Sequence, residues 1–226
     1  MNKLKNEIQS ISDRMRENGG PFWSREDGDI HAPAGFSTID VLRVLGELGA
    51  TIQKYSLLRD SVEFILTYQN PDGSFKYSAK STKLPCMAGR IVAALGRVGA
   101  LKDARLNVTY HWFLENQSND GGWRCATVKL GKSPITDASN PGTTLYILDA
   151  FRFRDNSPDD ILCLNRGIEF LLRHWETRAP LGPCEFGIGS RFLKLNILSL
   201  VIIYFIMCMF SRIIVWHTEI TVFVKH

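Results

Sequence analysis

The chain has 226 residues, enough for one domain of ordinary to large size, and 45% of them are hydrophobic while 22% are charged. This composition, with only 18 glycines and 9 prolines, excludes a disordered polyampholyte, a low-complexity chain and a collagen-like repeat. The formal net charge of +4 is mild, and no run of lysine and arginine would follow a phosphate backbone, so nucleic acid is not an expected partner.

The cysteines and the first residues favour a cytoplasmic protein. Five cysteines are an odd number and lack the dense spacing of a secreted disulfide scaffold, which predicts reduced thiols. The first 20 residues carry spread charges and contain no apolar segment of the kind found in signal peptides.

The N-terminal segment predicts a helix followed by a turn. Ile8, Ile11 and Met15 share one helical face. The segment Gly20-Pro21-Phe22 that follows is interpreted as a degenerate half copy of a turn that recurs downstream, with Arg16 in the position of a glutamine.

Internal repeats organise the rest of the chain. The segments 45–50 and 95–100 (LGELGA and LGRVGA) match at an offset of 50 residues, and each predicts a helix that stops at glycine. Period-2 alternation is nowhere sustained, although Gly122 to Leu130 could pair locally, so we expect an all-α fold. Apolar spacing predicts six helices in three pairs, at 37–48 and 57–68, 86–98 and 103–116, and 143–151 and 161–175.

A shared turn ends the second helix of the first two pairs. A glutamine is followed four residues later by glycine and two residues after that by an aromatic residue. The members are Gln69, Gly73 and Phe75 in one copy and Gln117, Gly121 and Trp123 in the other. Glycine permits a left-handed backbone, the aromatic ring covers the helix end, and the amide satisfies free backbone groups of a neighbouring helix. We therefore interpret these residues as structural staples between repeats. In a weaker third copy Trp175 stands where glutamine is expected.

This turn on paired helices resembles the QW motif of squalene-hopene and oxidosqualene cyclases and of the wider prenyltransferase and squalene-oxidase repeat family. The resemblance covers about residues 37–195. It implies an α/α toroid in which the first helix of each pair lines an inner cavity and the second lies outside. About three helical hairpins plus a half repeat are visible, fewer than a closed ring of this family needs, so a partial repeat domain is expected over residues 1–195.

The resemblance implies a protein that binds an isoprenoid or a similar apolar substrate. If it is an enzyme, it is expected to be a terpene cyclase or a prenyltransferase, but a partial ring would leave the cavity half built. The alternatives are a non-catalytic α-repeat scaffold that binds lipid or protein, and a tail-anchored membrane protein. An open arc of repeats also exposes its ends, which predicts either a homo-oligomer that closes the arc or a C-terminal tail that caps it. No cofactor is assigned.

One aspartate is the candidate acid. Class II terpene cyclases protonate their substrates with an Asp-x-Asp-Asp motif, which does not occur here. Asp137 lies shortly before the third inner helix, near where the family places its acid. The alternative is that Asp137 forms an Asx turn in a polar loop. The segment Ser157-Pro158-Asp159-Asp160 is interpreted as a helix start, with an N-cap and an acidic first turn. His111 and His174, on outer helices, are expected to be solvated or to cap helix ends.

Two cysteines are candidate metal ligands. Cys86 is expected at the N-terminus of an inner helix, where the helix dipole favours a thiolate, and Cys125 follows the second turn. Cys184 or His31 would complete a metal or nucleophile cluster. The Asp-x-Cys pair that binds zinc in protein prenyltransferases is absent, and a small buried thiol is the alternative for each cysteine.

The C-terminal residues 196–226 form an apolar tail. From Leu195 to Trp216 the chain holds 18 apolar residues in 22, and a membrane span needs about 20. Membrane contact through 195–216 is therefore one expectation. The other is a shifted reading frame near Asn196, because the repeat pattern predicts a further glycine-bearing turn and inner helix at this point.

Overall fold

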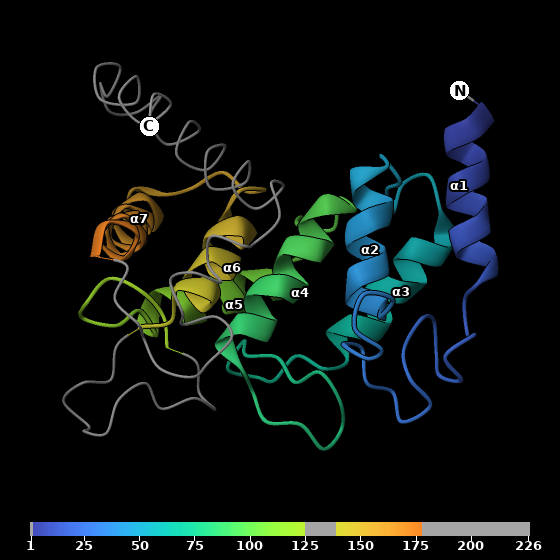
Figure 1. Cartoon of the computed structure of the whole chain (residues 1–226), viewed down its shortest axis with the longest axis horizontal. Coiled ribbons are helices and arrows are strands. Elements are labelled where there is room, and N and C mark those ends of the chain that lie inside the picture. Colours follow the sequence, from blue (N-terminus) through green and yellow to red (C-terminus); the bar gives the residue numbers. More distant parts are fainter. Residues whose placement is uncertain (1, 125–138, 178–226) are drawn as a thin grey trace.

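The computed structural model describes residues 2–124 and 139–177. Within these residues the chain folds into seven α-helices, and its only strand-like pairings are isolated bridges, so the all-α expectation is confirmed for this part. The helices are α1 (Asn2–Asp13), α2 (Thr38–Glu47), α3 (Ser56–Leu66), α4 (Pro85–Arg97), α5 (Arg105–Glu115), α6 (Pro141–Phe151) and α7 (Pro158–Thr177) (Figure 1).

All six helices predicted from apolar spacing are present, with ends that differ from the prediction by three residues at most. The largest difference lies at the start of α7, which begins at Pro158, three residues before the predicted start, and α6 likewise begins early, at Pro141. Proline suits the first helical position because its missing N–H would have no partner there. Asn140 caps α6, since its side-chain oxygen accepts a hydrogen bond from the Thr143 amide at 2.9 Å.

Helices α2 and α4 end in the same way. After each C-cap residue comes a glycine with φ of 81°, and the next alanine donates to the carbonyl oxygen five residues earlier. The distances are 2.9 Å from Ala50 to Leu45 and 3.0 Å from Ala100 to Leu95. This is a Schellman motif, in which a left-handed glycine satisfies carbonyl groups at the helix end. The prediction that both helices stop at glycine is confirmed.

Helices α2, α4 and α6 form one row, with α4 packed against both of the others (Figure 1). Helix α5 packs on α4, and α7 packs on α6. The two helices α4 and α6 meet backbone to backbone, because a Cβ added at Gly89 would lie 2.8 Å from the backbone carbonyl carbon of Tyr146. Helices α1 and α7 stand at the two ends of the row (Figure 1).

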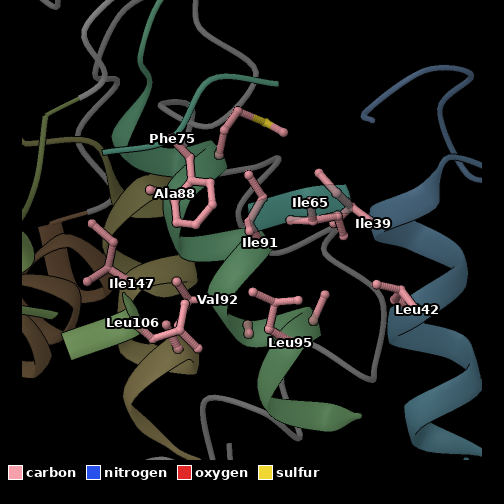
Figure 2. Close-up of a cluster of buried hydrophobic side chains, with 14 of the residues drawn as sticks. Ile39, Leu42, Ile65, Phe75, Ala88, Ile91, Val92, Leu95, Leu106 and Ile147 are labelled. Atoms are coloured by element: carbon pink, nitrogen blue, oxygen red, sulfur yellow. The ribbon is translucent and has the colours of Figure 1, made fainter. Parts of the chain in front are cut away.

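A continuous apolar core joins these helices. Burying a leucine, isoleucine or phenylalanine side chain stabilises a fold by about 1.5–3 kcal/mol, so the core is the main source of stability. Figure 2 shows part of it, with buried side chains drawn from α2 to α6 and from the turn after α3: Ile39, Leu42, Ile65, Phe75, Ala88, Ile91, Val92, Leu95, Leu106 and Ile147.

Candidate functional site

The turn after α3 fastens that helix to the start of α5. The Gln69 amide nitrogen donates to the Arg105 carbonyl oxygen and to the Thr109 hydroxyl, both at 2.8 Å. The Thr109 hydroxyl in turn donates to the Gly73 carbonyl oxygen at 2.7 Å. Gly73 has φ of 86°, and a Cβ at this position would lie 2.5 Å from the Val108 carbonyl oxygen. Only glycine allows this backbone conformation and this close approach.

The turn after α5 fastens that helix to α7. The Gln117 amide nitrogen donates to the Cys163 carbonyl oxygen at 2.7 Å and to the Gly121 carbonyl oxygen at 2.8 Å. Gly121 has φ of 95°, and a Cβ there would lie 2.5 Å from the Arg166 carbonyl oxygen. Each turn thus uses a glutamine and a glycine to hold the next odd-numbered helix.

The two turns contact corresponding residues. The glutamine and the glycine recur after 48 residues, and the residues that they touch in α5 recur in α7 after 58 residues. Phe75 and Trp123, which end the two motifs, are both fully buried. One contact differs: Gly167 stands at the position of Thr109, so no hydroxyl is available and Gln117 reaches the turn glycine directly.

The N-terminal turn follows the same pattern in a different register from the predicted one. An isolated antiparallel bridge joins Gly19 to Arg25, as another joins Gln69 to Phe75. By this pairing Gly19 stands at the position of Gln69, three residues from the predicted Arg16, and Trp23 and Arg25 stand where the motif has its glycine and its aromatic residue. Backbone hydrogen bonds set the register of such a turn, whereas the prediction depends on side-chain types alone.

Helix α4 carries two arginines that each contact an acidic residue of a neighbouring helix. Arg90 and Arg97 are seven residues apart and so lie on one side of the helix. Val92, on the opposite side, is fully buried. The two arginines mark two polar groups of residues that each involve α2, α4 and α6, and the Arg97 group lies at the C-terminal ends of these helices.

The first group, which we name the Arg90 cluster, consists of His31, Asp40, Arg90 and Tyr146. Arg90 donates through Nη2 to Asp40 Oδ1 at 2.9 Å and so ties α4 to α2. Asp40 Oδ2 accepts hydrogen bonds from the Gly35 amide and the Ser37 hydroxyl, both at 2.8 Å. The Asp40 side chain is 8% exposed and that of Arg90 22%, so the ion pair is shielded from water on most sides.

His31 and Tyr146 both lie beside the Arg90 guanidinium. Its Nη1 lies 3.3 Å and 3.4 Å from the two ring nitrogens of His31, and its carbon lies 5.6 Å from the centre of the Tyr146 ring. Burial, and after it the charge of Arg90, lowers the pKa of His31 below its ordinary value. Burial also raises the pKa of the Tyr146 phenol. A neutral imidazole and a neutral phenol therefore lie beside a permanent cation.

The second group, which we name the charge belt, runs across the C-terminal ends of α2, α4 and α6. Arg97 Nη2 lies 2.8 Å from Asp149 Oδ2, and the two side chains are only 4% and 11% exposed. Glu47 Oε1 lies 3.5 Å from both Arg97 Nε and Arg43 Nη1, and Arg152 Nε lies 3.6 Å from Asp149 Oδ1. Five charges of alternating sign thus connect α2, α4 and the end of α6.

The structure describes two of the predicted chemical residues, Cys86 and His31, and His31 lies against Arg90 in the Arg90 cluster. Cys86 lies in the first turn of α4 and is buried. A negative charge on its sulfur would raise the pKa of Tyr146 further, so Cys86 lies near the Arg90 cluster. Asp137, Cys125 and Cys184 lie outside the described residues, as does the segment 195–216. Across 2–124 and 139–177, no group of three or more histidine, cysteine or acidic residues is arranged to hold a metal ion. In the same ranges, no helix has the length and apolarity needed to cross a membrane.

Two histidine expectations have different outcomes. His111 is exposed and lies 3.1 Å from Glu115, one turn further along α5. His174 is buried, so the expectation of a solvated side chain is wrong for this residue. It lies on the side of α7 that packs into the protein, where burial lowers its pKa. The predicted helix start at Ser157 is confirmed, because its hydroxyl accepts a hydrogen bond from the Asp160 amide at 3.2 Å.

Sequence reasoning missed the Arg90 cluster and the charge belt. A signal was present, because Asp40 and Arg90, and likewise Glu47 and Arg97, are separated by the same 50 residues as the repeated LGELGA and LGRVGA segments. Opposite charges at the repeat offset occupy matching positions on neighbouring helices, where they can pair.

Comparison with known proteins identified no relative of this chain. No protein-family model matches the chain, and no curated protein sequence matches it. We therefore base the function on the residues and contacts described above.

Proposed function

We propose that this protein is a helical-repeat protein of the terpenoid-cyclase and protein-prenyltransferase kind, folded as part of an α/α toroid, and that it binds an isoprenoid or a similar apolar chain. The corresponding contacts of the Gln69 and Gln117 turns carry this proposal. Turns that repeat with constant spacing and hold successive helices at the same points favour a curved array of identical units. In such an array α2, α4 and α6 are the inner helices.

The proposed binding face is the side of these inner helices that carries the Arg90 cluster and the charge belt. A pure hydrocarbon such as squalene would strip water from the partly exposed Arg90 guanidinium without replacing its hydrogen bonds, which is costly. An isoprenoid with a polar or anionic head group would instead accept hydrogen bonds from it. The face therefore favours a substrate with such a head group over squalene.

Catalysis would need an acid or a metal site in addition to the residues of this face. Asp137 is the proposed acid, and Cys86 with Cys125 the proposed metal ligands. A non-catalytic scaffold that binds lipid or protein is the second candidate function. It is favoured by the pairing of the acidic residues on this face, since Asp40, Glu47 and Asp149 each lie against an arginine.

Incubation of the full chain with labelled squalene, farnesyl diphosphate and geranylgeranyl diphosphate tests the proposal. Turnover that is lost in Asp137→Asn and retained in the control Asp159→Asn, at an exposed helix start, would support an enzyme. Saturable binding without product, weakened at least about tenfold by Arg90→Gln, would support a receptor for a polar isoprenoid. Absence of both turnover and binding would contradict the proposal and leave the non-catalytic scaffold as the remaining candidate function.

Membrane association is tested on the same chain. A protein anchored through the segment 195–216 would need detergent to stay in solution, and deletion of residues 196–226 would abolish that need. A detergent requirement that persists after the deletion would contradict an anchor in the tail.

A further inference from the structure

The Arg90 cluster brings a hydrogen-bond donor and a hydrogen-bond acceptor together at one point. Arg90 Nη1 carries N–H groups, which only donate, and it lies 3.3 Å from Nδ1 and 3.4 Å from Nε2 of His31. A neutral imidazole always keeps one ring nitrogen without a proton, and this nitrogen accepts a hydrogen bond. Burial and the charge of Arg90 lower the pKa of His31, so its imidazole is neutral at about pH 7.5.

Arg90 does not satisfy the acceptor nitrogen of His31. The two ring nitrogens point away from each other, so an atom almost equally distant from both lies along the lone pair of neither. Both distances are also longer than the usual hydrogen bond of about 2.9–3.0 Å. Across 2–124 and 139–177 the His31 ring has no further hydrogen bond. A ligand atom beside Arg90 Nη1 therefore meets an acceptor that is available.

The charges around this point cancel one another. Arg90 Nη2 lies 2.9 Å from Asp40 Oδ1, so the cation of the cluster already has its counter-charge. Two further charged side chains act on the rings of His31 and Tyr146, and each has an opposite charge beside it: Asp29 has Arg25 at 3.6 Å, and Arg43 has Glu47 at 3.5 Å. Within the part of the chain that the structure describes, an anionic ligand would find no cation in excess, and unpaired charges removed from water are costly.

We propose that the head group recognised by the Arg90 cluster is an uncharged hydroxyl, so that the ligand is an isoprenoid alcohol. The hydroxyl oxygen accepts from Arg90 Nη1, and its O–H donates to the unprotonated ring nitrogen of His31. This inference rests on the proposed function and deepens it by naming the head group.

Other oxygen head groups use only part of this arrangement. A diphosphate brings several negative charges to a site whose cation is already paired, and its ionised oxygens offer no O–H to His31. An ether or an epoxide accepts from Arg90 but has no proton to donate, so it leaves the imidazole nitrogen without a hydrogen bond. Only the alcohol satisfies both the arginine and the histidine.

Equilibrium binding of three probes to the full chain at about pH 7.5 tests the head group. The probes are farnesol, farnesyl methyl ether and farnesyl diphosphate, which share one hydrocarbon chain. The ether keeps the acceptor oxygen of farnesol and lacks only the O–H. Farnesol is expected to bind at least about tenfold more tightly than either of the others.

A substitution at His31 tests the same contact from the side of the protein. His31→Phe keeps an aromatic ring and removes the acceptor nitrogen, so farnesol and its ether should then bind with equal affinity. His111→Phe is the matched control, since the His111 side chain is 70% exposed on α5, and it should keep the preference for farnesol. Circular dichroism shows whether both variants are folded, and the comparison of probes on the unaltered chain does not depend on either variant.

The outcomes separate this inference from the proposed function. The ether or the diphosphate binding as tightly as farnesol would overturn the alcohol, and so would a preference for farnesol that survives in folded His31→Phe. Either result leaves the binding of an isoprenoid in place. Failure of all three probes to bind would overturn both proposals.

Discussion

Replacing Gly121 by alanine should loosen the attachment of the second turn to α7. The residue has φ of 95°, and the new Cβ would lie 2.5 Å from the Arg166 carbonyl oxygen, closer than real Cβ contacts come. The turn and the helix must therefore separate, which lengthens the hydrogen bond from Gln117 to Cys163, now 2.7 Å. The fully buried Trp123 two residues later would also lose packing.

The expected cost can be built from its parts. A left-handed backbone costs alanine about 1–2 kcal/mol, and the lower entropy of the unfolded chain offsets about 0.4–1 kcal/mol of this. The weakened hydrogen bond adds about 1 kcal/mol, and strained packing adds about 1 kcal/mol or more. The free energy of unfolding should thus fall by about 3 kcal/mol for Gly121→Ala.

Gly49→Ala is the matched control. Gly49 has φ of 81°, but a Cβ there would meet no atom within 4 Å. Only the backbone cost applies, so the expected loss is about 1 kcal/mol. Urea unfolding followed by tryptophan fluorescence measures both losses. Equal losses in the two variants would refute the close contact between Gly121 and α7.

Three further predictions concern buried polar groups. Asp149→Asn removes the nearer of the two counter-charges of the buried Arg97 and leaves Glu47 at 3.5 Å, so it should cost about 2 kcal/mol in urea unfolding. Glu63→Gln at an exposed pair should cost under about 1 kcal/mol, and similar losses would contradict the burial of the belt. Thr109→Val removes a hydroxyl that both accepts and donates, and should cost about 2 kcal/mol in the same assay, so an unchanged midpoint would count against this contact. Folding lowers the pKa of His31, so the unfolded chain binds the imidazole proton more readily than the folded chain does. The contribution of His31 to the free energy of unfolding is therefore complete above pH 6.5, and it declines as the pH falls from 6.5 toward the folded pKa. In His31→Gln this part of the curve of unfolding free energy against pH should flatten, and an unaltered slope would show that other groups cause it.

The sequence by itself determined the features that depend on neighbouring residues. The helices, their glycine stops and the helix start at Ser157 follow from side-chain size, backbone freedom and capping within one turn of the chain. Such interactions have the same form wherever the segment lies in the protein. The repeat of two motifs at a fixed spacing could be read in the same way, because each copy is complete within a short segment.

Only the tertiary structure decided which distant residues meet. Arg90 and Asp40 are 50 residues apart, and Arg97 and Asp149 are 52 apart, yet both pairs are in contact because α4 packs between α2 and α6. The spacing and rotation of packed helices choose the partners of each long side chain, and a linear pattern does not contain that information. The three-residue register of the N-terminal turn was likewise fixed by backbone hydrogen bonds, which residue types alone do not specify.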